Sequence, residues 1–199
     1  MFPSLLDYFT KAAKTEDNKI RVHMDDVFAV TKLSEHLAAL LNNLGKNRRP
    51  LVICIGTDRS TGDSLGPLTG WRLSSLLHGK NIEILGTIDN PVHAQNLESY
   101  LLRIRDKENG LTVIAVDACL GQLANVGTIL LEGKPLKPGA GVSKLLPEVG
   151  DISIYGIVNV GGFMEIQVLQ NTRLSIVMKM SCLIANSIFL ALRQTGHLN

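Results

Sequence analysis

The stretch Pro50–Trp71, PLVICIGTDRSTGDSLGPLTGW, decides the fold of this chain. Its first part, Leu51–Ile55, is an unbroken apolar run, which is typical of a β-strand buried on both faces. A polar loop with Asp58 and Asp63 follows, and from Leu65 the apolar residues recur at helical spacing. In α/β sheets the carboxyl ends of the strands line the ligand crevice. We therefore expect Asp58 and Asp63 to lie at a binding site.

The rest of the chain continues the alternation of strands and helices. Two more apolar strands are predicted, over Asn81–Ile88 and Leu111–Val116, with a helix over His93–Arg105 between them. Further predicted elements are a helix over 31–44, strands over 127–131 and 153–160, and a final helix over 171–192. This order favours parallel βαβ units. We expect a single three-layer αβα domain of the α/β class with a mostly parallel sheet.

Length and composition agree with one globular domain. The chain has 199 residues, of which 45% are hydrophobic and 19% charged, enough apolar material for a sizeable core. Residues 1–28 are mixed and weakly periodic, and we expect them to form an N-terminal arm or a short helix. Residues 29–199 are expected to form the αβα domain.

Charge and cysteine usage narrow the classes of function. A net charge of +2 without a large basic cluster argues against nucleic acid as a partner. The three cysteines lie in apolar stretches without paired spacing, which favours reduced thiols and a cytoplasmic protein. The apolar run over 175–192 is interrupted by polar residues such as Lys179 and Asn186, so we expect a buried helix and no membrane association. Nothing in the sequence favours a cofactor or excludes a homo-oligomer.

Three predicted strands run into aspartates: Asp63 follows the first, Asp89 the second and Asp117 the third. Parallel strands end at one edge of a sheet, so these carboxylates are expected to converge there. Two carboxylates held close together cannot both ionise cheaply, and such a pair can share general acid and general base roles around a water molecule. Asp63 and Asp117 are therefore the candidate catalytic residues.

Structural roles for these residues remain open alternatives. Asp63 precedes a helix and is also a suitable N-cap. Asp117 follows a wholly apolar strand, and a buried acid needs a partner. His93 could join Asp63 and Asp89 in a metal site, although a lone histidine is more often structural. Cys119 has no histidine near it in the sequence to activate it as a nucleophile.

Several motifs resemble those of a known family. The chain is similar to the spore germination protease, the endopeptidase that degrades small acid-soluble spore proteins, in three segments that occur in that family's order: the first loop CIG…GDSLGP (54–67), AVDA (115–118), and PGAGV with the strand after it (138–162). The whole sequence, including DNPVHA (89–94), resembles the YyaC-type sporulation proteins still more. A more distant resemblance in fold is to the hydrogenase maturation endopeptidases.

The resemblance implies a function and a set of site residues. In the germination protease family the proposed catalytic aspartates match Asp63 and Asp117. In the hydrogenase maturation family, two acids matching Asp63 and Asp89, and a later histidine, bind the metal of the substrate; here no histidine follows His93 until His197, so that set is incomplete and we expect no metal. The residues expected to bind substrate are Asp58, Asp89, Asn90, His93, Gly139 and Gly141.

Two functions follow as expectations. The first is a metal-independent aspartic-type endopeptidase of sporulation or germination, acting in the cytoplasm on a protein or peptide such as a small acid-soluble spore protein. The second is a non-catalytic binding or assembly factor that retains the protease-like fold. Retention of both aspartates favours the enzyme.

Overall fold

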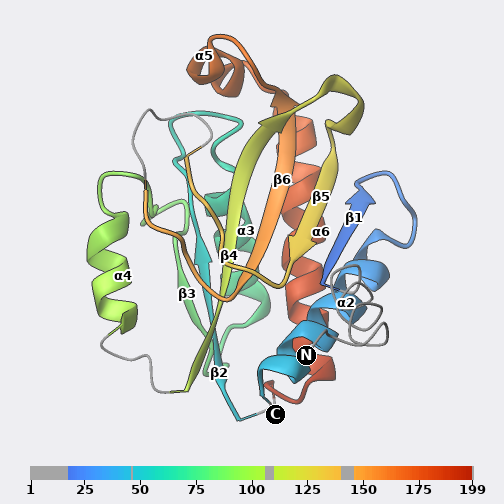
Figure 1. Ribbon diagram of the computed structural model, residues 1–199, viewed down its shortest axis with the longest axis vertical. Helices are drawn as coiled ribbons and strands as arrows, with labels where there is room; N and C mark the ends of the chain where they lie inside the picture. Colours follow the sequence, from blue (N-terminus) through green and yellow to red (C-terminus); the bar gives the residue numbers. More distant parts are fainter. Residues whose placement is uncertain (1–17, 46, 106–109, 140–145, 199) are drawn as a thin grey trace, which may run out of the picture.

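The predicted strands Leu51–Ile55 and Leu111–Val116 lie inside a six-stranded sheet in the computed structural model, which describes residues 18–45, 47–105, 110–139 and 146–198 (Figure 1). The strands are β1 (Lys19–His23), β2 (Arg49–Cys54), β3 (Glu83–Leu85), β4 (Leu111–Gly121), β5 (Thr128–Glu132) and β6 (Ile152–Val160). The helices are α2 (Ala29–Leu44), α3 (Leu65–Leu76), α4 (Leu97–Arg105), α5 (Glu165–Gln170) and α6 (Leu174–Gln194), and a short 3-10 helix spans Leu123–Asn125.

The strand order is β1-β5-β6-β4-β2-β3. Strand β2 pairs in parallel with β3 and β4, and β4 pairs in parallel with β6. Only the β5 pairings, with β6 and with β1, are antiparallel among the described strands. The sheet is therefore mostly parallel, and the prediction of a three-layer α/β domain is confirmed.

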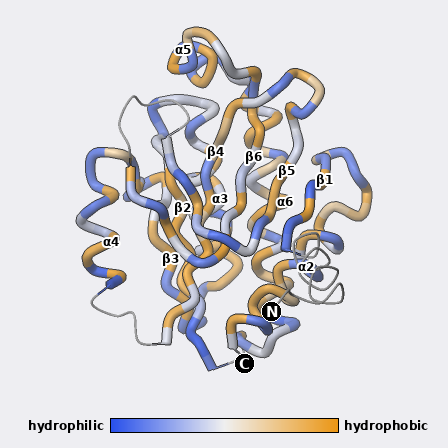
Figure 2. The backbone as a smooth tube through the Cα atoms, in the orientation of Figure 1, coloured by the Kyte–Doolittle hydropathy of each residue, from blue (hydrophilic) through white to orange (hydrophobic). Residues whose placement is uncertain are grey.

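Alternate residues of the central strands face two different cores. Leu51 and Ile53 of β2 pack with α4 on one face of the sheet, in a cluster that includes Leu101. Val52 and Cys54 belong to a larger cluster on the other face, which contains buried residues of α2, α3 and α6. Because both faces are covered, β2 and β4 are apolar at successive positions, and Figure 2 shows this hydrophobic character along the central strands.

Helix α6 is long and apolar enough to cross a membrane if length and composition alone are considered. In the structure it packs against α2 and α3, and one side of it is buried at residues that include Val177, Ile184 and Ile188. This arrangement is that of a core helix, as the interrupted apolar run predicted.

The structure departs from the predicted boundaries at the N-terminus. Lys19–His23 forms β1 and pairs with β5 at the edge of the sheet, so the part of the predicted arm from residue 18 onward is not separate from the domain. The five residues alternate between polar and apolar, as in a half-buried strand, but the run is short and charged, as edge strands often are. The rest of the arm, residues 1–17, lies outside the described residues.

Two further boundaries are corrected. The helix expected from His93 begins at Leu97, because the side chain of Asn96 accepts a hydrogen bond from the His93 N–H (2.8 Å) and donates one to the Pro91 carbonyl (3.0 Å), forming a turn before the helix. The strand expected to end at Val116 continues to Gly121, since β4 keeps pairing with β6 after its pairing with β2 has ended.

Candidate functional site

The loop between β2 and α3 is held in place by a very close backbone approach. Gly56 has φ +140°, and a Cβ atom there would lie 1.9 Å from the carbonyl oxygen of Asp63, so only glycine fits. The Thr57 N–H donates to that carbonyl oxygen at 3.3 Å. The loop thereby folds back on the end of β2 and fixes the backbone of Asp63 beside it.

Asp63 does not cap α3. The N-cap position belongs to Ser64, which makes no capping hydrogen bond and whose hydroxyl donates to the Thr61 carbonyl at 2.6 Å. The capping alternative for Asp63 is therefore wrong, and its carboxylate is available for another role.

Asp117 lies within β4, at the point where the neighbouring strand ends. The last paired residues of β2 and β4 are Cys54 and Val116, while on the other side Asp117 remains paired with Tyr155 of β6. The end of β2 leaves room beside Asp117, although the residue is only 5% exposed. Asp117 was predicted to follow the end of its own strand; in the structure it lies next to the end of the neighbouring strand β2, while β4 continues.

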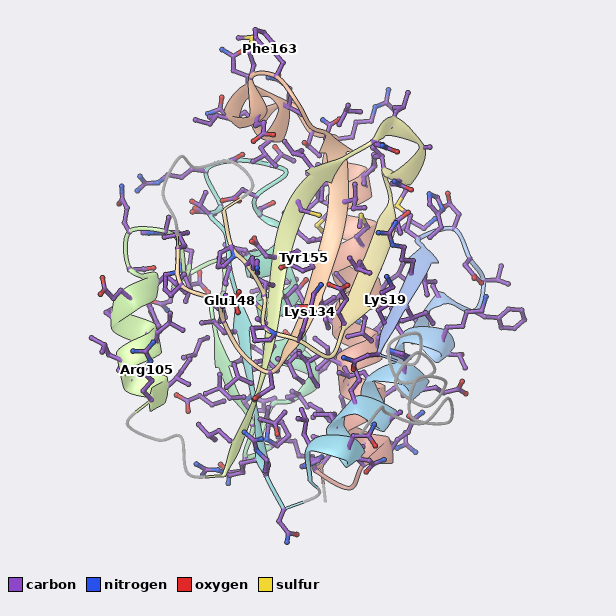
Figure 3. All side chains as sticks on the ribbon, viewed as in Figure 1. Lys19, Arg105, Lys134, Glu148, Tyr155 and Phe163 are labelled. Atoms are coloured by element: carbon purple, nitrogen blue, oxygen red, sulfur yellow. The ribbon has the colours of Figure 1, made fainter. Side chains whose placement is uncertain are left out.

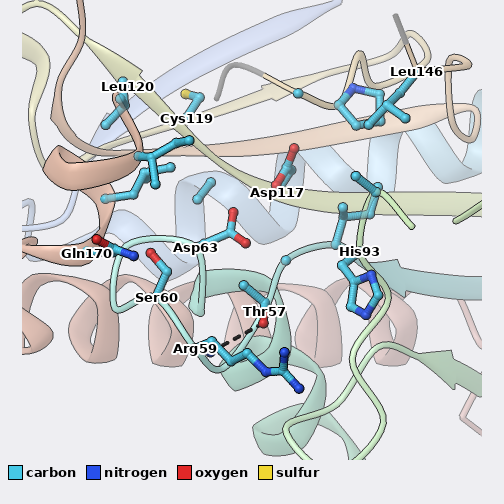
Figure 4. A pocket seen from close by; sticks show the side chains of 18 residues that line it. Thr57, Arg59, Ser60, Asp63, His93, Asp117, Cys119, Leu120, Leu146 and Gln170 are labelled. Atoms are coloured by element: carbon cyan, nitrogen blue, oxygen red, sulfur yellow. Dashed lines mark hydrogen bonds between the residues drawn. The ribbon is translucent and has the colours of Figure 1, made fainter. Parts of the chain in front are cut away.

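Asp63 and Asp117 line one cavity of about 330 Å³ (Figure 4). Its lining comes from the β2–α3 loop, the residues shortly before α4, the second half of β4, the segment after β5, and α5. The lining residues are Ile55, Gly56, Thr57, Arg59, Ser60, Asp63, His93, Ala94, Asp117, Ala118, Cys119, Leu120, Pro138, Gly139, Leu146, Ile166, Leu169 and Gln170.

Burial raises the pKa values of both carboxyl groups, and the charge of Asp63 raises that of Asp117 further. Burial raises the pKa of Asp63, while a hydrogen bond from the Thr57 backbone and the charge of His93 act in the opposite direction. The pKa of Asp117 lies well above its ordinary value, first because of burial and then because of the charge of Asp63. The two environments therefore favour proton retention at Asp117 more strongly than at Asp63.

The cavity thiol is poorly suited to nucleophilic catalysis. Burial, followed by the charge of Asp117, raises the pKa of Cys119 to about 12, so the thiolate is scarce at neutral pH. The cysteines of the described residues, Cys54, Cys119 and Cys182, are all free.

The structure brings together only part of the predicted site. Asp63, Asp117, His93 and Gly139 line the cavity, whereas Gly141 lies outside the described residues.

The remaining predicted substrate-binding residues, Asp58, Asp89 and Asn90, are exposed and do not line this cavity. Asp58 is on the outer side of the β2–α3 loop. Asp89 and Asn90 follow the short edge strand β3 in a turn closed by the Thr87 N–H and the Asn90 carbonyl at 3.2 Å. Because β3 already ends at Leu85, these two residues lie beyond the strand that was expected to carry them to the site.

Other lining residues were not predicted. Helix α5 contributes Ile166, Leu169 and Gln170, and it follows the Gly161-Gly162 pair that was interpreted only as the end of a strand. Its apolar residues Ile166 and Leu169, three positions apart, are a weak helical signal. Ser60 carries no sequence signal that distinguishes it from other serines in polar loops.

The residues present do not form the metal set of the hydrogenase maturation family. Among the residues that the structure describes, no three His, Cys, Asp or Glu side chains come close enough to hold a metal ion. His93 faces the cavity with Asp63, but Asp89, the second matching acid, is outside it. We therefore derive no chemical step through a metal.

Comparisons with known proteins give a family and a fold. The family described as "Protein of unknown function (DUF1256)" matches residues 21–187. The uncharacterized protein YyaC of Bacillus subtilis (strain 168) is 53% identical over 140 residues, covering 70% of this chain and 68% of YyaC. The NiFe hydrogenase maturation protease HycI of Thermococcus kodakarensis KOD1 aligns with a TM-score of 0.54 and 18% identity, covering 78% of this chain and 99% of HycI.

These comparisons confirm two parts of the predicted resemblance. The relation to YyaC is confirmed at the level of sequence, and the likeness to a hydrogenase maturation protease is confirmed at the level of fold. The relation to the spore germination protease stays a prediction from the motifs around Asp63 and Asp117.

Proposed function

Because this chain belongs to the DUF1256 family, whose description assigns no function, we propose an activity from its site: metal-independent, aspartic-type peptide hydrolysis. One observation carries the proposal. Asp63 and Asp117, from separate elements, face one cavity so closely that the charge of Asp63 raises the pKa of Asp117. Such a pair divides into one protonated and one ionised acid, as water-activating carboxylate pairs require.

The surroundings support a different role for each carboxyl group. Asp117 is buried in the sheet and holds its proton more strongly, so it acts as the general acid. Asp63 receives a hydrogen bond from the Thr57 backbone and lies near His93, both of which favour its ionised form. Asp63 is therefore the general base that takes a proton from water.

The reaction proceeds without a covalent enzyme intermediate. The water oxygen bonds to the peptide carbonyl carbon while Asp63 accepts the water proton and Asp117 protonates the carbonyl oxygen. The resulting tetrahedral diol then collapses: the C–N bond breaks, the leaving nitrogen takes a proton from Asp63, and the diol returns a proton to Asp117. Both acids regain their starting states, and one water is consumed for each bond broken.

The fold and the resemblances support a polypeptide substrate. HycI, which shares this fold, is a maturation protease, and the motifs around Asp63 and Asp117 resemble those of the spore germination protease. We extend the proposal to a cytoplasmic role in sporulation or germination, with acid-soluble spore proteins as the first substrates to test.

A second function, partner binding without catalysis, is favoured by the exposed apolar residues around the start of α5. Phe163 is 81% exposed, Met164 50% and Ile166 62%. Phe163 projects from the end of the molecule beyond the sheet (Figure 3). Exposed apolar groups gathered in one segment are typical of interaction surfaces. The same surface is compatible with an enzyme that holds a protein substrate.

The test is incubation of the full-length protein with a mixture of acid-soluble spore proteins. Wild-type protein should cleave them with a bell-shaped dependence on pH, because one acid must be ionised and the other protonated. Asp63→Asn and Asp117→Asn should each lower the rate by at least about 10³-fold, since asparagine keeps the shape but cannot transfer the proton. Products are identified by mass spectrometry.

Glu35→Gln is the matched control, because it neutralises an exposed carboxylate on α2 outside the cavity. It should retain the wild-type rate. Undiminished cleavage in both aspartate variants would remove the catalytic assignment, and a wild-type protein that binds the spore proteins without cleaving them would favour the second function.

A further inference from the structure

The cavity extends to two sides of the carboxylate pair. In Figure 4, Ser60, Leu120 and Gln170 lie on one side of Asp63 and Asp117, and His93 and Leu146 lie on the other. The first side also receives Ile166 and Leu169, which come from α5 with Gln170. We name the group of Ser60, Leu120, Ile166, Leu169 and Gln170 the α5 subsite.

Ser60 is the unusual member of the α5 subsite. Its hydroxyl oxygen is buried and has no hydrogen-bond partner among the residues that the structure describes. The next serine of the same loop behaves differently, since the Ser64 hydroxyl donates to the Thr61 carbonyl at 2.6 Å. A buried hydroxyl without a partner is costly, and such groups occur where a ligand completes the hydrogen bond.

The geometry around Ser60 does not support a nucleophilic role. None of the described residues accepts a hydrogen bond from its hydroxyl, and a serine nucleophile needs a base that does so. The Ser60 hydroxyl can still donate a hydrogen bond to a bound group or accept one from it. It lies beside Asp63 at the edge of the reacting centre (Figure 4).

The walls of the α5 subsite define what that bound group can be. Leu120, Ile166 and Leu169 are aliphatic, and Gln170 is polar but uncharged. None of the five subsite residues carries a charge that could pair with a charged side chain, whereas the buried Ser60 hydroxyl can hydrogen-bond to a neutral polar group. An aliphatic stem would pack on the leucines and isoleucine, and a neutral polar end could reach Ser60.

We propose that the α5 subsite binds an uncharged polar side chain of the polypeptide substrate, of the glutamine, asparagine or threonine type, and that Ser60 determines this specificity. The inference rests on the proposed function, because it takes the substrate to be a polypeptide. It adds the type of substrate side chain that binds next to the carboxylate pair.

A binding selection tests the subsite separately from catalysis. Full-length Asp117→Asn protein is immobilised, so that bound peptides are not cleaved, and is incubated with a randomised peptide library whose retained members are sequenced. Glutamine, asparagine or threonine should be enriched at one position. The same selection is repeated with Asp117→Asn protein that also carries Ser60→Ala. The enrichment of the polar residues over aliphatic residues should then fall about 3- to 10-fold, which corresponds to the free energy of one neutral hydrogen bond.

Thermal unfolding distinguishes this role from a structural one. Ser60→Ala in the otherwise wild-type protein should unfold at the same temperature or up to about 3 °C higher, because a buried unpaired hydroxyl is removed. Ser75→Ala is the control: its hydroxyl bonds the Trp71 carbonyl of its own exposed helix face at 3.4 Å, so peptide preference should not change.

The outcomes separate the two proposals. Enrichment that depends on Ser60, without cleavage by the wild type, would support the subsite and overturn peptide hydrolysis. Cleavage by the wild type with an unchanged preference in the Ser60→Ala background would support hydrolysis and overturn the subsite. Enrichment of charged residues, no enrichment, or a lower unfolding temperature for Ser60→Ala would also overturn the subsite.

Discussion

At the scale of the residue, position 117 is one where an ionised carboxylate destabilises the folded protein. It is almost fully buried within a central strand, and the nearest other carboxylate, Asp63, adds repulsion. A residue needed only for packing at this point of β4 could be apolar, as Val116 and Ala118 are on either side. The molecule retains an ionisable group where ionisation is unfavourable, which is typical of catalytic sites.

The first prediction follows from this cost. The pKa of Asp117 is higher in the folded than in the unfolded chain, so folded protein binds more protons between the two values, and the free energy of unfolding falls as pH rises through that interval. The loss of stability caused by ionising buried Asp117 is absent at pH values below its pKa in the unfolded chain, and it is complete at pH values above its pKa in the folded protein. Asp117→Asn should therefore be more stable than wild type at high pH and differ little from it in acid.

Urea unfolding followed by circular dichroism, over roughly pH 4 to 9, measures this difference. The control is again Glu35→Gln, which removes an exposed carboxylate on α2 and should leave the curve of stability against pH nearly unchanged. An Asp117→Asn protein that is less stable than wild type at high pH would show that the carboxylate is structurally required.

The sequence indicated the two central acids but not the complete site. Asp63 and Asp117 could be predicted because Asp63 follows the buried strand β2 and Asp117 follows the continuous apolar run of β4, which lies beside β2 in a parallel pair. Asp89 was expected by the same rule, but β3 is an edge strand that ends early, and the rule needs strand lengths that the sequence does not show. Ser60 could not be found at all, since an unpaired hydroxyl is a property of three-dimensional packing.

At the scale of the element, α5 is a small helix tied to the site through its carboxyl end. The Leu169 carbonyl accepts the Gly62 N–H of the acidic loop at 2.8 Å. The Asn159 side chain of β6 donates to the Val168 carbonyl and to the Thr172 hydroxyl, each at 3.2 Å. These contacts join the end of β6, α5 and the loop carrying Asp63 into one unit.

A second prediction uses this attachment. Asn159→Ala should lose about 1 kcal/mol of stability, roughly 2–4 °C in unfolding temperature, because the two hydrogen bonds above are lost, together with the one that its side-chain oxygen accepts from the Val160 N–H at 2.8 Å. Cleavage should fall further than stability alone explains, because the Asp63 loop would lose a fixed neighbour. Asn171→Ala is the matched control, since the Asn171 side chain donates only to the Gln167 carbonyl of α5 itself, at 2.8 Å. Equal effects of the two variants on turnover would contradict the attachment.

Some helices and strands could be predicted from the sequence much more accurately than others. Helices α2 and α6 and strands β2 and β4 carry long periodic or continuous apolar patterns, and these were predicted within a few residues. The short elements β1 and α5 were missed. Both are only five or six residues long with few or no buried residues, so a local pattern such as the alternation in β1 is too short to decide the structure without partners distant in the sequence.

At the scale of the whole molecule, stability and the candidate site lie in different places. The centre of the sheet is covered on both faces, and β4 is paired on both sides along much of its length. The cavity lies beyond the end of β2, and loop residues and α5 contribute to its lining (Figure 4). Binding elements placed at the least buried end can move or adjust without opening the core.

This distribution gives the last prediction, on amide hydrogen exchange. Helices α4 and α5 form a natural comparison: α4 buries Leu97, Leu101 and Ile104 against the sheet, whereas α5 has no buried residue. Amides of β4 should exchange only through global unfolding and therefore most slowly. Amides of α4 should exchange faster than those of β4, and amides of α5 should exchange fastest of the three. Mass spectrometry of peptides covering 97–105, 111–121 and 165–170 measures the order. Protection of α5 equal to that of β4 would mean that α5 is part of the stable core, and the site would then be rigid on every side.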